Sequence, residues 1–204
     1  MGKKPAWVII KRRDSSGEWI VGHQGLATDA FANNKFLKLD ASNSTFTNSL
    51  VFDAEPTTTV TQIVSNGAGG AANLTSSGTY VMYSWAEITG YSKFGSYVGN
   101  GNSNGQYVYL GFRPAFILIK REASENWIIA DYKRNSNDRT SPADSYLAAN
   151  GNGAEATGIV YDLNQNGVKF RNSSQNESGN VYYYAAFADS PGITPFGGAT
   201  ANAQ

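Results

Sequence analysis

The sequence predicts an all-β fold made of two tandem, internally duplicated antiparallel β-sandwich-like units. The first observation behind this is a repeat: five sequence blocks recur in the same order, starting with residues 5–12 and again with residues 114–121. The second is that short apolar runs rich in β-branched residues alternate with turns of Gly, Asn, Ser and Thr. The third is that no segment has the periodicity of a helix longer than a turn or two. Short strands with regularly spaced turns are typical of sandwiches and barrels.

Each unit opens with an apolar strand, at residues 7–10 and again at residues 116–119. Both faces of these runs are apolar, so we expect strands that are covered on both sides. A polar turn then leads to a second strand that begins at Trp19 in the first unit and at Trp127 in the second.

The later blocks predict further strands. Residues 158–162 and 168–171 flank an Asn166-Gly167 pair, and Asn-Gly supplies the positive φ angles that a tight hairpin needs. Residues 80–85 and 181–187 are rich in Tyr, Val and Ala and are expected to be the closing strands of the two units.

These patterns divide the chain into a first unit at residues 1–96, a second at 97–190 and a Gly/Ala-rich tail at 191–204. By composition, residues 99–105 suit either a flexible interdomain linker or a long hairpin turn. The second unit has an additional strand-like segment ahead of its Pro-Ala pair that the first lacks. We therefore expect the chain to begin inside a repeat whose leading strand is missing.

Composition excludes several classes of function. Sixteen basic residues balance sixteen acidic ones, so no net charge attracts the chain to nucleic acid. There is no cysteine for a disulfide or a thiolate zinc site, and a single histidine leaves few options for metal. No segment approaches the length of a membrane span. We therefore expect no nucleic-acid partner, no membrane insertion, no metal and no cofactor.

Several residues invite a functional interpretation that a structural one outweighs. Trp19 and Trp127 could stack on sugar rings, but their recurrence after matched turns favours packing in the core. Residues 162–167 begin like a calcium loop, yet the twelfth position is Ser173 rather than Glu, and an Asn-Gly hairpin explains them without metal. His23 has carboxylates nearby in sequence, but we expect a surface or hydrogen-bonded histidine rather than a catalytic one.

The densest polar cluster is a loop in the second unit whose counterpart in the first unit is nearly uncharged. A divergent loop on a repeated scaffold is where function is expected, although a solvated loop with internal ion pairs would have the same composition. We expect five of its residues to face solvent and to bind a glycan or charged ligand: Tyr132, Arg134, Asn137, Asp138 and Arg139.

Three motifs carry a resemblance to a known group of proteins. They are GYSKFGSYVGNG at residues 90–101, GFRPA at 111–115 and AFAD at 186–189. The chain resembles, over nearly its whole length, repeats in tail-fibre and other virion structural proteins of marine bacteriophages, especially those infecting cyanobacteria. The resemblance implies a module of a virion appendage and carries no catalytic or ligand-binding residues onto this sequence.

Together these observations predict a non-enzymatic virion protein. We expect a tail-fibre module that adheres to a bacterial surface, with glycan as the ligand, or that presents an adhesive tip. A capsid or tail decoration protein is an alternative of the same class, and a polysaccharide depolymerase is the rival of a different class. Fibres of this kind are often trimers, so we expect a homo-oligomer that also contacts other virion proteins. Tyr182, Tyr183 and Tyr184 are the candidate intersubunit residues.

Overall fold

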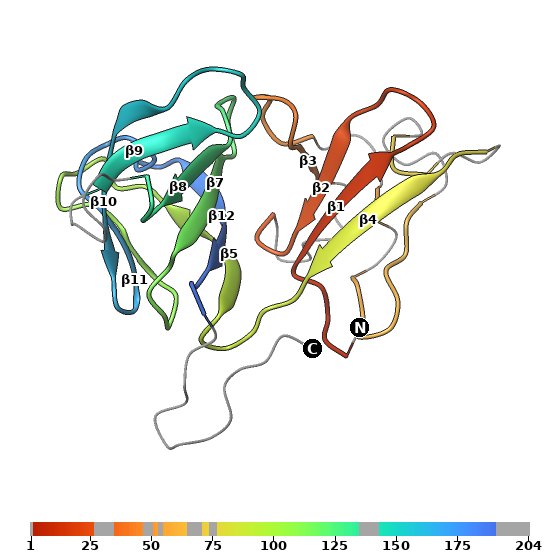
Figure 1. The fold of residues 1–204 in the computed structure, drawn as a ribbon, viewed down its shortest axis with the longest axis horizontal. Coiled ribbons are helices and arrows are strands. Elements are labelled where there is room, and N and C mark those ends of the chain that lie inside the picture. Colours follow the sequence, from red (N-terminus) through yellow and green to blue (C-terminus); the bar gives the residue numbers. More distant parts are fainter. Residues whose placement is uncertain are drawn as a thin grey trace. The chain divides into compact units, whose positions relative to one another are not determined.

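The computed structural model confirms an all-β, antiparallel fold (Figure 1). It describes residues 2–26, 35–46, 51–52, 55–64, 71–73, 77–134 and 143–190. The chain divides into two compact units, Met1–Glu87 and Ile88–Gln204. No helix in the described ranges has the length and apolarity needed to cross a membrane.

Unit 1 contains one four-stranded sheet in the order β3-β2-β1-β4. Its strands are β1 (Trp7–Arg12), β2 (Trp19–His23), β3 (Leu37–Lys38) and β4 (Tyr80–Trp85). On one face Val8, Ile10 and Ile20 pack with Phe52 in the core of the unit, and all four are almost completely buried. The central strand β1 is therefore the apolar strand that the sequence predicts.

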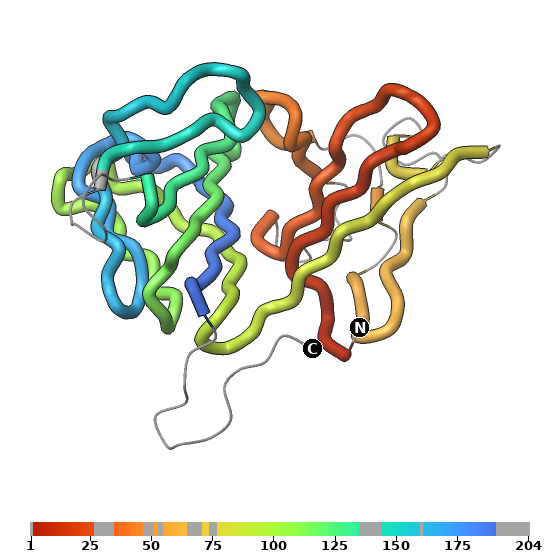
Figure 2. Tube along the Cα trace, in the orientation of Figure 1, coloured from red at the N-terminus to blue at the C-terminus, as the bar shows by residue number. Residues whose placement is uncertain are grey.

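Unit 2 contains one eight-stranded sheet in the order β5-β12-β7-β8-β9-β10-β11-β6. The strands are β5 (Ser92–Val98), β6 (Tyr107–Tyr109), β7 (Phe116–Arg121), β8 (Ile128–Asp131), β9 (Ala143–Ala148), β10 (Ala156–Asn164), β11 (Gly167–Phe170) and β12 (Val181–Phe187). The tube in Figure 2 lets the reader follow the chain through them in order.

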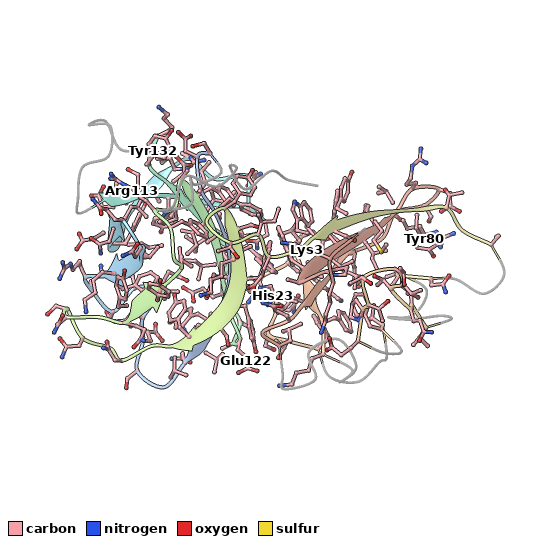
Figure 3. All side chains as sticks on the ribbon, turned by 90° about the horizontal axis from the view of Figure 1, so that it is seen from below. Lys3, His23, Tyr80, Arg113, Glu122 and Tyr132 are labelled. Carbon is pink, nitrogen blue, oxygen red and sulfur yellow. The ribbon has the colours of Figure 1, made fainter. Side chains whose placement is uncertain are left out.

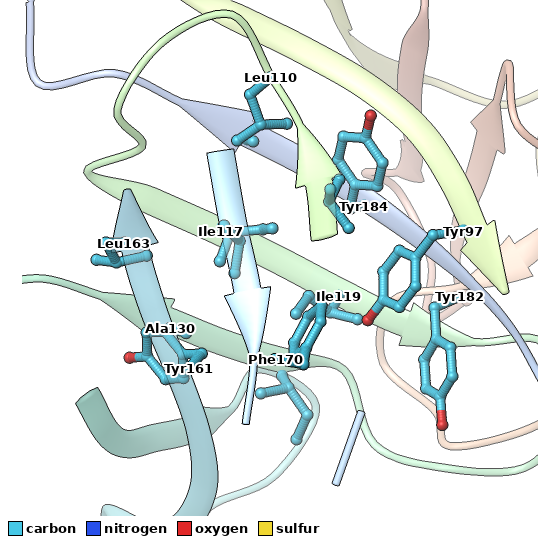
Figure 4. Close-up of a cluster of buried hydrophobic side chains, with 14 of the residues drawn as sticks. Tyr97, Leu110, Ile117, Ile119, Ala130, Tyr161, Leu163, Phe170, Tyr182 and Tyr184 are labelled. Carbon is cyan, nitrogen blue, oxygen red and sulfur yellow. The ribbon is translucent and has the colours of Figure 1, made fainter. Parts of the chain in front are cut away.

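The sheet of unit 2 folds over on itself around a single core (Figure 4). Tyr97 of β5 stacks on Phe170 of β11 with ring centroids 5.1 Å apart, although these strands belong to opposite halves of the sheet. Tyr97 also stacks on Tyr182 of β12 at 5.1 Å. Offset aromatic stacking of this kind stabilises a core beyond the area it buries. The arrangement is the sandwich-like unit that the sequence predicts.

The duplication is visible in the backbone hydrogen bonds, since strands β3-β2-β1-β4 of unit 1 correspond to β9-β8-β7-β12 of unit 2. The Ala6 amide donates to the Trp85 carbonyl at 2.7 Å, and the Ala115 amide donates to the Phe187 carbonyl at 2.8 Å. Four further pairs of equivalent hydrogen bonds are present, in which an amide of unit 1 and its counterpart in unit 2 donate to equivalent acceptors. With the bond of unit 1 first, they are Gln24 to Ala6 with Tyr132 to Ala115; Arg13 to Thr79 with Glu122 to Val181; Leu39 to Trp19 with Ala149 to Trp127; and Trp19 to the Asp40 side chain with Trp127 to the Asn150 side chain. The repeat in the sequence is therefore a repeat in the structure.

The aromatic residues follow the predicted register. Trp7 pairs with Trp85, and their counterparts Phe116 and Phe187 pair in the same way. Trp7 and Trp127 are buried, as expected for core residues. Trp19 is only half-buried, like Trp85, Phe116 and Phe187, so the predicted core position is confirmed for Trp127 and not for Trp19.

The boundary between the units lies at Glu87/Ile88 and not after residue 96 as predicted from the sequence. The reason is β5, which pairs with β12 along its whole length, from Ser92 opposite Phe187 to Val98 opposite Val181. Residues 88–96 therefore belong to the second unit.

Residues 99–105 form an ordered connection from β5 to β6 rather than a tether. The side chain of Asn176, which is completely buried, accepts from the amides of Asn100 and Gln106 and donates to Asn100, Asn102 and Asn172. A Cβ at Gly99 would lie 2.3 Å from the Glu177 carbonyl oxygen, so close backbone approach requires glycine there. The small and polar residues of this segment, which resemble the composition of a linker, allow it to pack tightly around Asn176.

The three tyrosines expected at a subunit interface are covered by their own chain. Tyr182 and Tyr184 belong to the core of unit 2, and Tyr183 is buried with its hydroxyl donating to Glu122 at 3.0 Å. Because β12 is a central strand between β5 and β7, its side chains are enclosed on both faces. Their assignment as intersubunit residues is wrong.

Candidate functional site

The structure describes two of the five residues predicted to bind a ligand. Tyr132 and Arg134 are described, and Asn137, Asp138 and Arg139 lie outside the described residues. Tyr132 directly follows β8, and Arg134 lies two residues further along the same turn.

Tyr132 does not face solvent as predicted. It is only 9 % exposed, packs in the core of unit 2 and donates its hydroxyl to Asp189 Oδ1 at 2.9 Å. In unit 1 the equivalent Gln24 donates its side-chain amide to Glu87 at 2.8 Å. Both pairs join the turn after the second strand to the segment after the closing strand. Tyr132 therefore has a structural role: its hydrogen bond to Asp189 connects two segments of unit 2, and Gln24 and Glu87 make the equivalent connection in unit 1.

Arg134 closes the same turn. Asp131 Oδ1 accepts from the amides of Lys133 and Arg134 at 2.9 and 3.0 Å, which is an Asx-type turn. The Arg134 guanidinium group then forms ion pairs with Asp131 at 2.8 Å and with Glu155 at 3.2 Å. These contacts match the alternative in which the loop's charges pair with one another.

His23 occupies the position of Asp131, because His23 pairs with Trp7 as Asp131 pairs with Phe116. His23 is buried, and its Nδ1 accepts from the Gly25 amide at 2.9 Å. It therefore caps its turn as Asp131 does, in keeping with the hydrogen-bonded histidine expected from the sequence.

Asp162, the first residue of the calcium-like stretch, has a protein partner. It forms an ion pair with Arg171, the residue that directly follows β11. Asn164 pairs with Gly167 at the end of the β10–β11 hairpin, so the Asn-Gly turn lies where the sequence predicts it. The hairpin accounts for these residues structurally.

The most unusual polar constellation in the described residues lies at the end of β7 and was not singled out from the sequence. We call it the Arg121 cluster, and it comprises Arg121, Glu125, Gln175, Glu177 and Asn180. Arg121 is the last residue of β7, Glu125 lies in the β7–β8 turn, and the other three residues precede β12. Figure 3 shows Glu122, the neighbour of Arg121, at the opposite end of unit 2 from Tyr132.

The guanidinium group of Arg121 holds the Arg121 cluster together. Its Nη1 lies 2.9 Å from Glu177 and 3.9 Å from Glu125, and its Nη2 donates to Asn180 at 3.1 Å. Gln175 Nε2 donates to the other oxygen of Glu125 at 2.8 Å. One arginine thus links the turn after β7 to the segment that leads into β12.

Gln175 is the strained member of the cluster. Its φ of 55° lies in the left-handed region, which is unusual for a residue other than glycine. Its carbonyl accepts from the Tyr97 hydroxyl at 2.7 Å, which fixes the backbone in place. Three buried atoms of the Arg121 cluster have no hydrogen-bond partner among the described residues: Arg121 Nε, Glu125 Oε2 and Gln175 Oε1.

Burial changes the ionisation of groups around this end of the unit. It raises the pKa of Tyr97 well above its ordinary value, and it also raises the pKa of Tyr182 and of Tyr183. It lowers the pKa of Lys120 to about 8, because the low-dielectric interior disfavours the ammonium form. Lys120 Nζ donates to the carbonyls of Arg121 and Ala123 at 2.7 and 3.0 Å.

Chemically, the Arg121 cluster is suited to hydrogen bonding. Both of its carboxylates share one guanidinium group as their ion-pair partner. The buried atoms of the cluster that have no hydrogen-bond partner among the described residues are one donor and two acceptors. Sequence analysis missed the cluster because the Lys-Arg pair recurs in both units, whereas Gln175, Glu177 and Asn180 join it only through the fold.

Comparisons with known proteins give one family. The model of a domain of unknown function, DUF7483, matches residues 1–191. Neither the curated proteins nor the solved structures include a significant match to the chain. The matched region extends over both units and includes every described residue, and the chain therefore belongs to the DUF7483 domain family.

Proposed function

We propose that the protein is a non-enzymatic structural module of a phage virion, part of a tail fibre that adheres to the bacterial surface or presents an adhesive tip. The observation that carries this proposal is the duplication. Five equivalent backbone and side-chain hydrogen bonds recur in two compact units, as in proteins that extend a structure by repeating one module. The sequence resemblance to virion repeats of marine phages supports the same role.

The character of the polar residues favours a neutral, hydroxyl-rich ligand such as a surface glycan. The chain has no net charge, and its loops are rich in Asn, Ser and Thr. Described charges such as Arg134, Arg171 and Arg121 are committed to ion pairs within the chain. Adhesion would then depend on hydrogen bonds and apolar contacts more than on long-range attraction.

A polysaccharide depolymerase is the second candidate, and one observation favours it. Glu125 and Glu177 lie within 4 Å of the same Arg121 atom, so two carboxylates converge as glycoside hydrolysis requires. The contacts within the cluster argue against it, since Arg121 engages both carboxylates and Gln175 also donates to Glu125.

The deciding experiment locates the protein and tests its adhesion. Gold-labelled antibodies against the chain should mark the tail fibres of the particles that carry it. The fluorescently labelled chain should bind host cells and compete with adsorption of those particles. Labelling of the capsid would indicate a decoration protein. Release of reducing sugar from host polysaccharide, abolished by Glu125→Gln, would replace adhesion with hydrolysis.

A further inference from the structure

The outer edge of β4 differs from that of its counterpart in unit 2. β4 pairs with β1 from Tyr80 opposite Arg12 to Trp85 opposite Trp7, and it is the last strand of its sheet among the described residues. Its counterpart β12 lies between two strands, β7 and β5. Among the described residues, the same strand therefore has one neighbouring strand in unit 1 and two in unit 2.

The hydrogen-bond pattern shows which backbone groups of β4 point away from β1. The Arg13 amide donates to the Thr79 carbonyl, so in an antiparallel ladder alternate residues from Thr79 onward face β1. The amides and carbonyls of Met82 and Ser84 therefore point to the other side. In unit 2 the equivalent residues are Tyr184 and Ala186, which lie opposite Gly95 and Lys93 of β5.

Side-chain exposure follows the same difference. Met82 and Tyr83 of β4 are 40 % and 45 % exposed, whereas the equivalent Tyr184 and Ala185 of β12 are 5 % and 3 % exposed. A strand edge with outward-pointing amides and exposed large side chains is a template for pairing with a further strand.

We propose that β4 accepts an antiparallel strand of the β5 type, supplied by another polypeptide, through backbone hydrogen bonds to Met82 and Ser84. The duplication defines the occupant, because β5 fills this place beside β12. If the donor strand pairs with β4 in the register that β5 has with β12, its residue equivalent to Tyr97 lies opposite Tyr80. Its residue equivalent to Gly95 then lies opposite Met82. Tyr80 packs against the core of unit 1, so a donor aromatic ring meets it as Tyr97 meets Tyr182.

This inference goes beyond the proposed function and does not depend on it. The interaction is β-strand addition, in which main-chain bonds supply affinity and the alternate side chains supply specificity. Glycine at position 95 of β5 is needed in unit 2, where a Cβ would lie 2.7 Å from the Tyr184 hydroxyl. Opposite Met82, which is narrower than tyrosine, a donor with alanine at this position also fits.

The test uses the full chain and a synthetic peptide of residues 90–99, GYSKFGSYVG. We expect one peptide to bind per chain and to slow amide exchange at Met82 and Ser84 by at least about tenfold. Two N-methylated peptides are the matched controls. Methylation at Tyr97 removes an amide of the ladder and should abolish binding, whereas methylation at Ser96 removes one that points away and should not.

A chain variant tests the acceptor side. Met82→Pro removes the outward amide but keeps the ladder to β1, since proline is tolerated at the open side of an edge strand. It should abolish peptide binding while amide protection at Ile9 is retained. The proposal is overturned if the native peptide does not bind or if methylation at Tyr97 has no effect. Protection that appears on β12 instead of β4, or pairing of β4 with β4 of a second copy of the chain, would also overturn it.

Discussion

Unit 1 and unit 2 share a four-stranded sheet but differ in what surrounds it. In unit 2, β5, β6, β10 and β11 extend the sheet until it folds over its own core. In unit 1 the described sheet ends at β4, and Met82 and Tyr83 remain exposed where unit 2 buries Tyr184 and Ala185. Exposure in a repeat protein therefore depends on which neighbouring strand is present and not only on the residue.

The same contrast holds for the matched arginines after the first strand. Arg12 pairs with Asp14, two residues away, and this hydrogen bond lowers the pKa of that carboxyl to about 2. Arg121 instead joins two carboxylates and an amide from distant segments. One position in the repeat thus supports a local surface pair in one unit and a long-range connection in the other.

The largest expected effect concerns the matched tryptophans. Trp127→Ala removes a side chain that is only 3 % exposed and should lower the free energy of unfolding by about 3–5 kcal/mol. Trp19→Ala, at the half-buried equivalent position, should cost clearly less. Urea denaturation of both variants measures the difference. Equal losses would mean that the two units bury this position equally.

The next effect concerns the loop that unit 2 uses to connect its two edge strands. Asn176→Ala removes five side-chain hydrogen bonds and leaves the amides of Asn100 and Gln106 without this acceptor. We expect a loss of about 3 kcal/mol, because buried polar groups without partners are costly. Amide exchange should show whether residues 99–105 become unprotected. If Asn176→Ala leaves the unfolding free energy unchanged, the loop is a passive tether.

A smaller effect is expected from the arginine pair. Arg121→Ala should destabilise the protein by about 2 kcal/mol, because Glu125 and Glu177 lose their shared partner. Arg12→Ala should leave the melting temperature nearly unchanged, since an exposed local ion pair contributes little. Calorimetry of both variants checks the contrast, which disappears if the Arg121 cluster is as solvated as the Arg12 pair.

The smallest effect is a pH dependence. Burial lowers the pKa of Lys120 from 10.5 to about 8, so between these values the unfolded chain binds more protons than the folded one. The penalty for burying the charge is fully present below pH 8 and is relieved as the pH rises toward 10.5. The stability of the native protein relative to Lys120→Met should therefore rise by about 1 kcal/mol between pH 8 and 9. Urea denaturation of both proteins across this pH range measures the effect. A difference in unfolding free energy that does not change with pH would contradict the prediction.

Much of the fold could be predicted because the repeat shows the same pattern of strands and turns twice in one sequence. The pairing of Trp7 with Trp85 and of Phe116 with Phe187 follows the matched sequence blocks, and the Asn166-Gly167 turn determines its hairpin locally. The position of the predicted binding residue Tyr132 could not be predicted in the same way. Tyr132 belongs to a polar turn, but its partner Asp189 lies 57 residues away, so its burial is not encoded near it.

The sequence alone determined the all-β class, the duplication and the family, since strand propensity, turn residues and repeated blocks are local properties. Only the tertiary structure decided where the units divide, that residues 99–105 pack around Asn176, and that Arg121 gathers Glu125 and Glu177. The physical reason is that sheet order and buried polar networks join segments far apart in the chain. Composition describes each segment but not which other segment it meets.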